Sequence, residues 1–171
     1  LSQLPTLCGM TNSTITLSIG EIVVARDDLI LQGPDPSAGS VAISPVAYSS
    51  YRVFNHTGLG TLFVNELTVQ NGYHQGGGLF GLGGCIKSNG NVALGHSTVK
   101  NCNARGSQAL GGGIMTYGSL LLVDSTVSGN NVWGDPGNGV GGGVYASGAL
   151  TVKYSTLSAN HATTLGGGAY A

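Results

Sequence analysis

Apolar and polar residues alternate along much of the chain, and the alternating segments recur at a nearly constant spacing. In segment 150–153, Leu150 and Val152 alternate with Thr151 and Lys153. A period of two residues is typical of a β-strand with one buried face, and helical spacing is absent. Earlier segments repeat the pattern, which gives three columns: Leu62, Val92, Leu120 and Leu150; Val64, Leu94, Leu122 and Val152; and Val69, Val99, Val127 and Leu157. The columns predict short strands that stack in register.

Each repeat opens on a glycine-rich motif. The segment GGGIMTYGSLLLVDSTVSGN returns as GGGVYASGALTVKYSTLSAN, an earlier variant reads GGCIKSNGNVALGHSTVKNC, and GGGAYA lies at the end. The motif starts at Gly83, Gly111, Gly141 and Gly166 are 28, 30 and 25 residues apart. Such a period is typical of stacked repeats and predicts an all-β solenoid of about 25–30 residues per coil. We expect irregular N-terminal coils over 1–60 and regular repeats over 61–171 that end within a coil.

The repeat also predicts where the backbone bends. Five residues separate Val64 from Val69, an odd step, so the strand must bend between these columns, where later repeats place Ser97, Ser125 and Ser155. Asn130 and Asn160 close the motif, and Asn suits a left-handed turn there. The glycines predict a corner with positive φ or close backbone packing. Segments 71–82, 103–110 and 131–140 differ in length and are expected to be insertions on one side of the solenoid.

The GGGI and GGGV motifs, followed by STVSGN and STLSAN, resemble the repeats of bacterial parallel β-helix surface and secreted proteins, such as the polymorphic outer-membrane proteins. This resemblance implies a right-handed parallel β-helix that is exported and has a structural or adhesive role at the cell surface. We expect no cofactor and no turnover. The alternative is a carbohydrate-binding or carbohydrate-active domain, because polysaccharide lyases also use parallel β-helices.

The composition of the chain limits the kinds of partner that it can bind. The net charge is −1, and the six Lys and Arg residues are scattered, so nucleic acid is excluded as a main partner. No apolar run reaches the ~20 residues of a transmembrane helix. Cys8, Cys85 and Cys102 are an odd count, which in an exported protein allows one bridge and one leftover. Cys85 and Cys102 are the natural pair because both replace regular motif residues within one coil, and two separately buried thiols are the alternative.

Two features could bind a ligand. One is a column in which successive coils place a carboxylate, an imidazole, a carboxylate and a phenol: Glu66, His96, Asp124 and Tyr154. This column is either a proton-handling site or a surface charge ladder, and we favour the ladder because exposed charge pairs are common. The other is Trp133, which with Asp135 and Pro136 marks a protruding loop. It could bind a glycan, although a Trp there more often packs against its own loop. No zinc-ligand spacing is present, and we expect no metal site.

The ends of the chain suggest self-association. The last motif, with Gly166, Gly167, Gly168 and Tyr170, stops within a coil, and exposed strand edges invite pairing. Near the start, Asn12, Ser13, Thr14 and Ile15 resemble the Ser-Thr-Val segment that would follow. Either the first strands of one subunit complete the last coil of another, which would build a filament, or the chain is part of a longer repeat protein.

Overall fold

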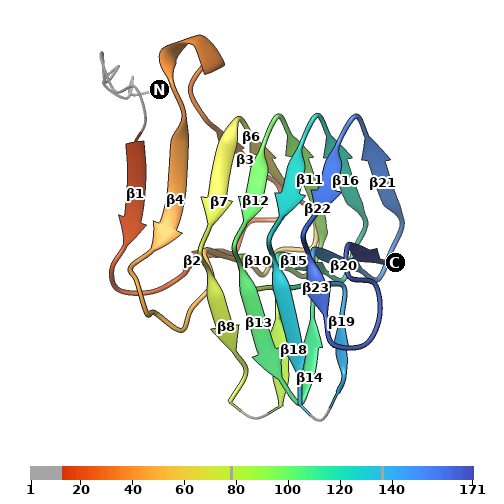
Figure 1. The fold of residues 1–171 in the computed structure, drawn as a ribbon. Coiled ribbons are helices and arrows are strands. Elements are labelled where there is room, and N and C mark those ends of the chain that lie inside the picture. Colours follow the sequence, from red (N-terminus) through yellow and green to blue (C-terminus); the bar gives the residue numbers. More distant parts are fainter. Residues whose placement is uncertain (1–12, 78, 136) are drawn as a thin grey trace.

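The computed structural model describes residues 13–77, 79–135 and 137–171. It is an all-β fold in which every strand pairs in parallel with the equivalent strands of neighbouring coils. The strands form a β-solenoid of about 5 turns, and Figure 1 shows the coils stacked side by side from the red N-terminal end to the blue C-terminal end. The predicted fold class is therefore confirmed.

Three sheets enclose the main core. Sheet A contains β1 (Ser13–Leu17), β4 (Val41–Pro45), β7 (Leu67–Gln70), β12 (Thr98–Lys100), β17 (Thr126–Ser128) and β22 (Thr156–Ser158). Sheet B contains β2 (Ile22–Val24), β5 (Phe54–His56), β10 (Ile86–Ser88), β15 (Ile114–Thr116), β20 (Val144–Ala146) and β24 (Ala169–Tyr170). Sheet C contains β3 (Leu29–Gln32), β6 (Thr61–Asn65), β11 (Asn91–Gly95), β16 (Leu120–Val123) and β21 (Leu150–Lys153). A short 3₁₀ helix, η1 (Pro36–Ala38), lies between β3 and β4.

Two further sheets form a thin extension, which we call the fin. Sheet D contains β8 (Tyr73–Gln75), β13 (Asn103–Gly106), β18 (Asn131–Gly134) and β23 (His161–Ala162). Sheet E contains β9 (Phe80–Leu82), β14 (Gln108–Leu110) and β19 (Gly139–Val140). Figure 1 shows the fin below the main body. Segments 71–82, 103–110 and 131–140 lie on one side of the solenoid, as expected, but most of their residues are in strands that pair from coil to coil.

The three predicted columns point into the main core. Strand pairing aligns them as expected, for example Leu94 with Leu122 and Leu122 with Val152. Leu62, Leu94 and Leu122 are completely or almost completely buried, whereas Val152 in the last full coil is 42% exposed. Burial of these aliphatic residues, at about 25 cal/mol per Å² of apolar surface, is the main source of stability.

The bend between sheets C and A has a left-handed backbone. Glu66, His96, Asp124 and Tyr154 have φ between 45° and 54°. His96 and Asp124 are each followed by a buried serine, Ser97 and Ser125. These serines link neighbouring coils, because Ser97 N donates a hydrogen bond to Ser125 Oγ at 3.2 Å. The predicted bend is confirmed. The residues with the left-handed backbone are the same four that form the column of candidate ligand residues.

The bend after sheet A differs from the prediction by one residue. The positive φ values belong to Asn71, Asn101, Gly129 and Ala159. Asn130 is fully buried instead, and its Oδ1 accepts from Cys102 N at 3.0 Å while its Nδ2 donates to Val99 O at 3.2 Å. The prediction of a left-handed Asn130 is therefore wrong. The residue is an Asn because its amide satisfies backbone groups inside the solenoid, where an unpaired polar group is costly.

Both reasons predicted for the glycine motifs apply. Gly111 has a φ of 65°, a conformation that glycine adopts without steric cost. At Gly112, a Cβ would lie 2.2 Å from the carbonyl oxygen of Gly142 in the next coil. The corner between sheets E and B thus needs a left-handed residue followed by one without a side chain.

The fin is thin because small residues fill it. Its core consists of Ala104, Ala109 and Val132, with Ala162 packed against them. A Cβ on Gly106 would lie 2.5 Å from Gly81 N on the opposite sheet. The backbones of sheets D and E therefore lie too close at Gly106 for any side chain.

A disulfide joins Cys85 to Cys102 across one coil, and both residues are fully buried. Cys85 precedes β10 and Cys102 follows β12, so the bond crosses the core beside the junction of fin and main body. Cys8 lies outside the described residues.

Candidate functional site

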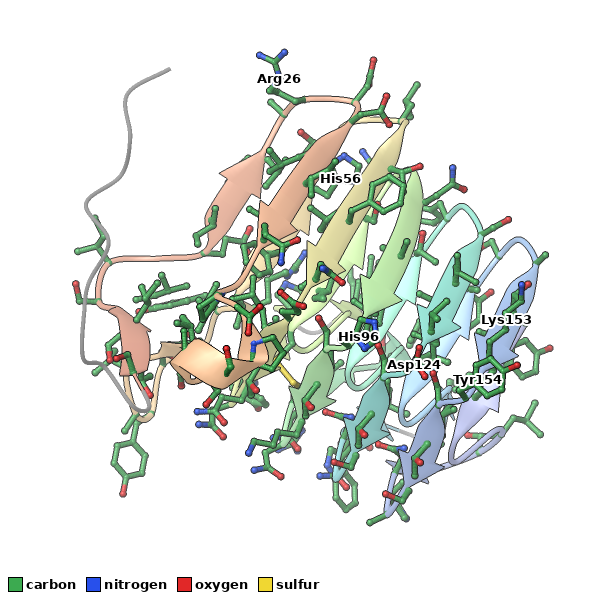
Figure 2. All side chains as sticks on the ribbon, turned by 90° about the horizontal axis from the view of Figure 1, so that it is seen from above. Arg26, His56, His96, Asp124, Lys153 and Tyr154 are labelled. Carbon is green, nitrogen blue, oxygen red and sulfur yellow. A yellow bond between two sulfur atoms is a disulfide. The ribbon has the colours of Figure 1, made fainter. Side chains whose placement is uncertain are left out.

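The column of Glu66, His96, Asp124 and Tyr154 projects from the bend into solvent. Figure 2 shows His96, Asp124 and Tyr154 following one another across successive coils. His96 Nε2 lies 4.0 Å from Asp124 Oδ2, and both side chains are about half exposed. Glu66 is engaged elsewhere, because its Oε2 accepts from Gln32 Nε2 at 2.6 Å. An exposed pair of this kind contributes about 0–1 kcal/mol.

A hollow of about 470 Å³ lies beside this column. The loop that carries η1 forms one wall, through Pro34, Pro36, Gly39 and Ser40, and Glu66, Leu67, Thr68, His96 and Thr98 form the other. Of the four residues in the column, Glu66 and His96 line this hollow, and Asp124 and Tyr154 do not. In the part of the chain that the structure describes, no group of three or more His, Cys, Asp or Glu residues is arranged to hold a metal ion.

A second candidate is the outer face of sheet D. Along each strand, alternate residues point into the fin or away from it: Ala104 and Val132 are fully buried, whereas Arg105 and Trp133 are exposed. Strand pairing places Arg105 beside Trp133. The outward residues therefore form polar and aromatic rows that run from coil to coil.

Trp133 lies on β18 rather than in a protruding loop, so the expected position is wrong. Its side chain is 47% exposed. Its ring centroid lies 5.1 Å from that of His161 on the next coil, with the planes tilted by 37°. An aromatic ring that is anchored on a strand and packed on one side keeps its other surface available at little cost in side-chain entropy.

The Trp133 ring borders a hollow of about 490 Å³, which we call the Trp hollow. Its lining is Tyr73, Asn103, Arg105, Trp133, Gly134 and Asp135. The guanidinium of Arg105 has no ion pair or side-chain hydrogen bond with any described residue. The Trp hollow thus combines two aromatic rings with an unpaired donor group, an amide and a carboxylate.

Titratable groups at the root of the fin are held in one state. His74 points into the fin, and its Nδ1 accepts from Leu82 N at 3.1 Å, so the neutral ring carries its proton on Nε2. Burial, and then the positive charge of Arg52, lower the pKa of His74 to about 4. Arg52 itself is buried, with its Nε 3.2 Å from Glu21 Oε2. His74, Arg52 and Glu21 are not among the residues that line the Trp hollow.

The proposed assembly residues lie at opposite edges of the solenoid. Ser13, Thr14 and Ile15 are in β1, one edge of sheet A, and Asn12 lies outside the described residues. The final glycines, Gly166, Gly167 and Gly168, lead into β24, an edge of sheet B, where the ring of Tyr170 stacks on Tyr145 with centroids 5.6 Å apart.

Sequence reasoning grouped Asp135 with Trp133 but missed Tyr73, Asn103 and Arg105 as its neighbours. A signal was present, because NARG at 103–106 and NVWG at 131–134 share one alternating phase. The same 28-residue spacing that separates Gly83 from Gly111 also separates Asn103 from Asn131, but the segments that follow differ in length before the next glycine motif, and so they resemble insertions.

The residues that the structure describes contain no helix long and apolar enough to cross a membrane. No protein-family model matches the sequence, and comparisons with curated proteins and with solved structures find no match.

Proposed function

We propose that this protein is a non-catalytic, adhesive β-solenoid that acts outside the cell and binds surface glycans through the outer face of sheet D. The observation that carries this proposal is the Trp hollow, in which the half-exposed ring of Trp133 lies beside the unpaired guanidinium of Arg105.

The chemistry of the Trp hollow suits a sugar. A pyranose ring has a face of C–H groups and a rim of hydroxyls. The ring of Trp133 can stack against that face, as aromatic residues do at interfaces where one side is apolar and the other wet. Arg105 supplies donors, Asp135 supplies acceptors, and the amide of Asn103 supplies both, which together match the hydroxyl rim.

The disulfide supports an extracellular location. Cys85 and Cys102 are bonded and fully buried. Structural disulfides persist in oxidising compartments and are rare in the cytosol. The glycine-rich, weakly charged composition, with 8% charged residues, is that of the exported repeat proteins which the sequence resembles.

The arrangement of carboxylates favours binding over cleavage. Glycoside hydrolysis ordinarily uses two carboxyl groups that flank the scissile bond. Among the described residues that line the Trp hollow, Asp135 is the single carboxylate. A glycan bound in the Trp hollow would contact the carboxylate of Asp135 but no second carboxylate among the described lining residues.

A glycan-array screen followed by calorimetry tests this proposal. We expect Trp133→Ala to lower affinity for the selected glycan by about tenfold or more, the typical cost of losing an aromatic hot spot. Phe63→Ala is the matched control, because Phe63 is 42% exposed on the outer face of sheet C and should leave binding unchanged. If no glycan binds, or if both variants bind like the wild type, the proposal is wrong.

A second candidate function is end-to-end assembly, and strand register favours it. Pairing through sheet A aligns Thr14 and Ile15 of β1 with Thr156 and Leu157 of β22, and so Ser13 with Ser155, which directly precedes β22. These two strands are the edges of the sheet. Three successive coils donate a backbone N–H to the serine hydroxyl of the next coil, as Ser125 N does to Ser155 Oγ at 3.0 Å. A second copy stacked with its β1 on β22 would present Ser13 Oγ to Ser155 N in the same way.

Light scattering with electron microscopy tests assembly. Fibres one solenoid wide are expected at high concentration, and Ile15→Lys should abolish them because Ile15 would enter the extended core. A monomer at every concentration would contradict this second candidate without affecting the glycan proposal.

A further inference from the structure

A second hollow adjoins the Trp hollow at Tyr73. This second hollow has a volume of about 670 Å³ and is lined by Thr16, Ser44, Pro45, Val46, Ala47, Tyr48, Ser49, Asn71 and Tyr73. Tyr73 therefore lines both. We call the surface formed by these two hollows, which adjoin at Tyr73, the axial groove.

The axial groove runs along the solenoid axis. Its lining comes from successive coils: Thr16 on β1, Ser44 on β4, Tyr73 on β8, Arg105 on β13 and Trp133 on β18. Tyr73 N donates a backbone hydrogen bond to Tyr51 O at 3.2 Å, which places segment 45–51 in the coil that precedes β8. Four steps between coils at the usual strand spacing give a length of about 19 Å. That length accommodates several linked sugar rings rather than one.

Tyr48 marks the far end of the groove. Its side chain is fully exposed and its φ is 62°. It occupies the third position of a tight turn in which Ser49 N donates to Val46 O at 3.2 Å, a place that favours Gly or Asn when φ is positive. A bulky residue held in this conformation costs free energy, and such residues cluster at ligand sites.

The charge of the groove is balanced. Of the described residues that line it, Arg105 and Asp135 carry the charges, one of each sign, and both lie at the Trp133 end. The Tyr48 end presents hydroxyl, amide and apolar groups. An anionic polymer would gain from Arg105 alone and would be repelled by Asp135, so the groove favours an uncharged chain.

We infer that the ligand is an extended, uncharged polysaccharide that lies parallel to the solenoid axis and stacks on Tyr48, Tyr73 and Trp133 in turn. This inference rests on the proposed function and specifies the length, the charge and the direction of its glycan. Aromatic residues contributed by successive coils suit an extended, β-linked chain better than a coiled one.

Calorimetry with β-1,4-linked gluco-oligosaccharides, from the disaccharide to the hexasaccharide, tests the inference. Affinity should rise by about tenfold or more along the series and should change little between low and high salt, because charge contributes little to it. Oligogalacturonates of the same lengths should bind more weakly than the neutral chains.

Tyr48→Ala is the critical variant. It should weaken the hexasaccharide by about three- to tenfold and leave the disaccharide unchanged, since a short ligand stays near Trp133. Tyr154→Ala is the matched control, because Tyr154 is also highly exposed with a φ of 50° but lies outside the groove. Circular dichroism confirms that each variant folds.

The outcomes separate the two proposals. If glycans bind through Trp133 but affinity is independent of chain length, of Tyr48 or of ligand charge, the axial groove is refuted and the glycan function stands. If no oligosaccharide of either series binds, and the array finds no other glycan, both proposals fail.

Discussion

Truncation of one core residue tests the register on which the whole fold depends. Leu122 lies in β16 and is fully buried, with Leu94 and Val152 above and below it in the same column. We expect Leu122→Ala to destabilise the protein strongly. Leu121→Ala on the same strand should have little effect, because Leu121 is 36% exposed on the opposite face.

The magnitude follows from burial and rigidity. Loss of about three buried methylene equivalents costs about 2–2.5 kcal/mol. The cavity adds to this cost, because hydrogen-bonded strands hold the neighbouring coils at a fixed spacing and prevent collapse. We therefore expect a loss of about 3–4 kcal/mol in the free energy of unfolding for Leu122→Ala. Leu121→Ala should cost less than about 1 kcal/mol.

Equilibrium denaturation in urea, followed by circular dichroism, measures both values. The slope of the unfolding curve should stay the same so that the midpoints can be compared. Equal losses for the two variants, or a larger loss for Leu121→Ala, would refute the register, because a shift of one residue exchanges the two faces of a strand.

Three further predictions concern the fin and its root. The disulfide between Cys85 and Cys102 joins residues 17 positions apart, and its reduction should lower the free energy of unfolding by about 2–4 kcal/mol. Denaturation with and without reductant measures this loss. The double variant Cys85→Ala/Cys102→Ala is the control, because reductant should not change its stability. Ala109→Leu should cost about 1–3 kcal/mol or more because the fin core has no room, whereas exposed Gln108→Leu should not. The pKa of His74 is about 4 in the folded protein and about 6.5 in the unfolded chain. The free energy of unfolding should therefore be full above pH 6.5 and fall by roughly 1–2 kcal/mol as the pH drops to 4. The variant His74→Gln should flatten this part of the pH profile.

The solenoid was predictable because its signals are local and repeated. Leu122 recurs as Leu94 and Val152 at nearly constant spacing, and the alternation around each of them specifies a strand. The bend before Ser97 followed from an odd step between columns. The left-handed residue after sheet A was misplaced by one position, since Asn130 suits either a turn or a buried amide and the sequence does not distinguish these roles.

The fin and the axial groove were not predictable for physical reasons. The fin strands are two to four residues long and are packed by Gly and Ala, so residues such as Ala104 give no hydrophobic signal. The groove joins Tyr48, Tyr73 and Trp133, which are far apart in sequence and meet only because parallel coils stack. Trp133 was identified as a candidate from its residue type, but its position on a strand depends on pairing with the neighbouring coils.

Trp133 is the sole tryptophan in the sequence, so its fluorescence reports directly on the proposed binding face. The most direct test is a titration of the wild-type protein with the tightest-binding glycan, followed by tryptophan emission and by iodide quenching. A sugar stacked on the half-exposed ring should shift the emission to shorter wavelength and reduce quenching, with the same midpoint as calorimetry. If calorimetry shows saturable binding while the emission and the quenching of Trp133 stay constant, the glycan binds elsewhere and the account of sheet D is wrong.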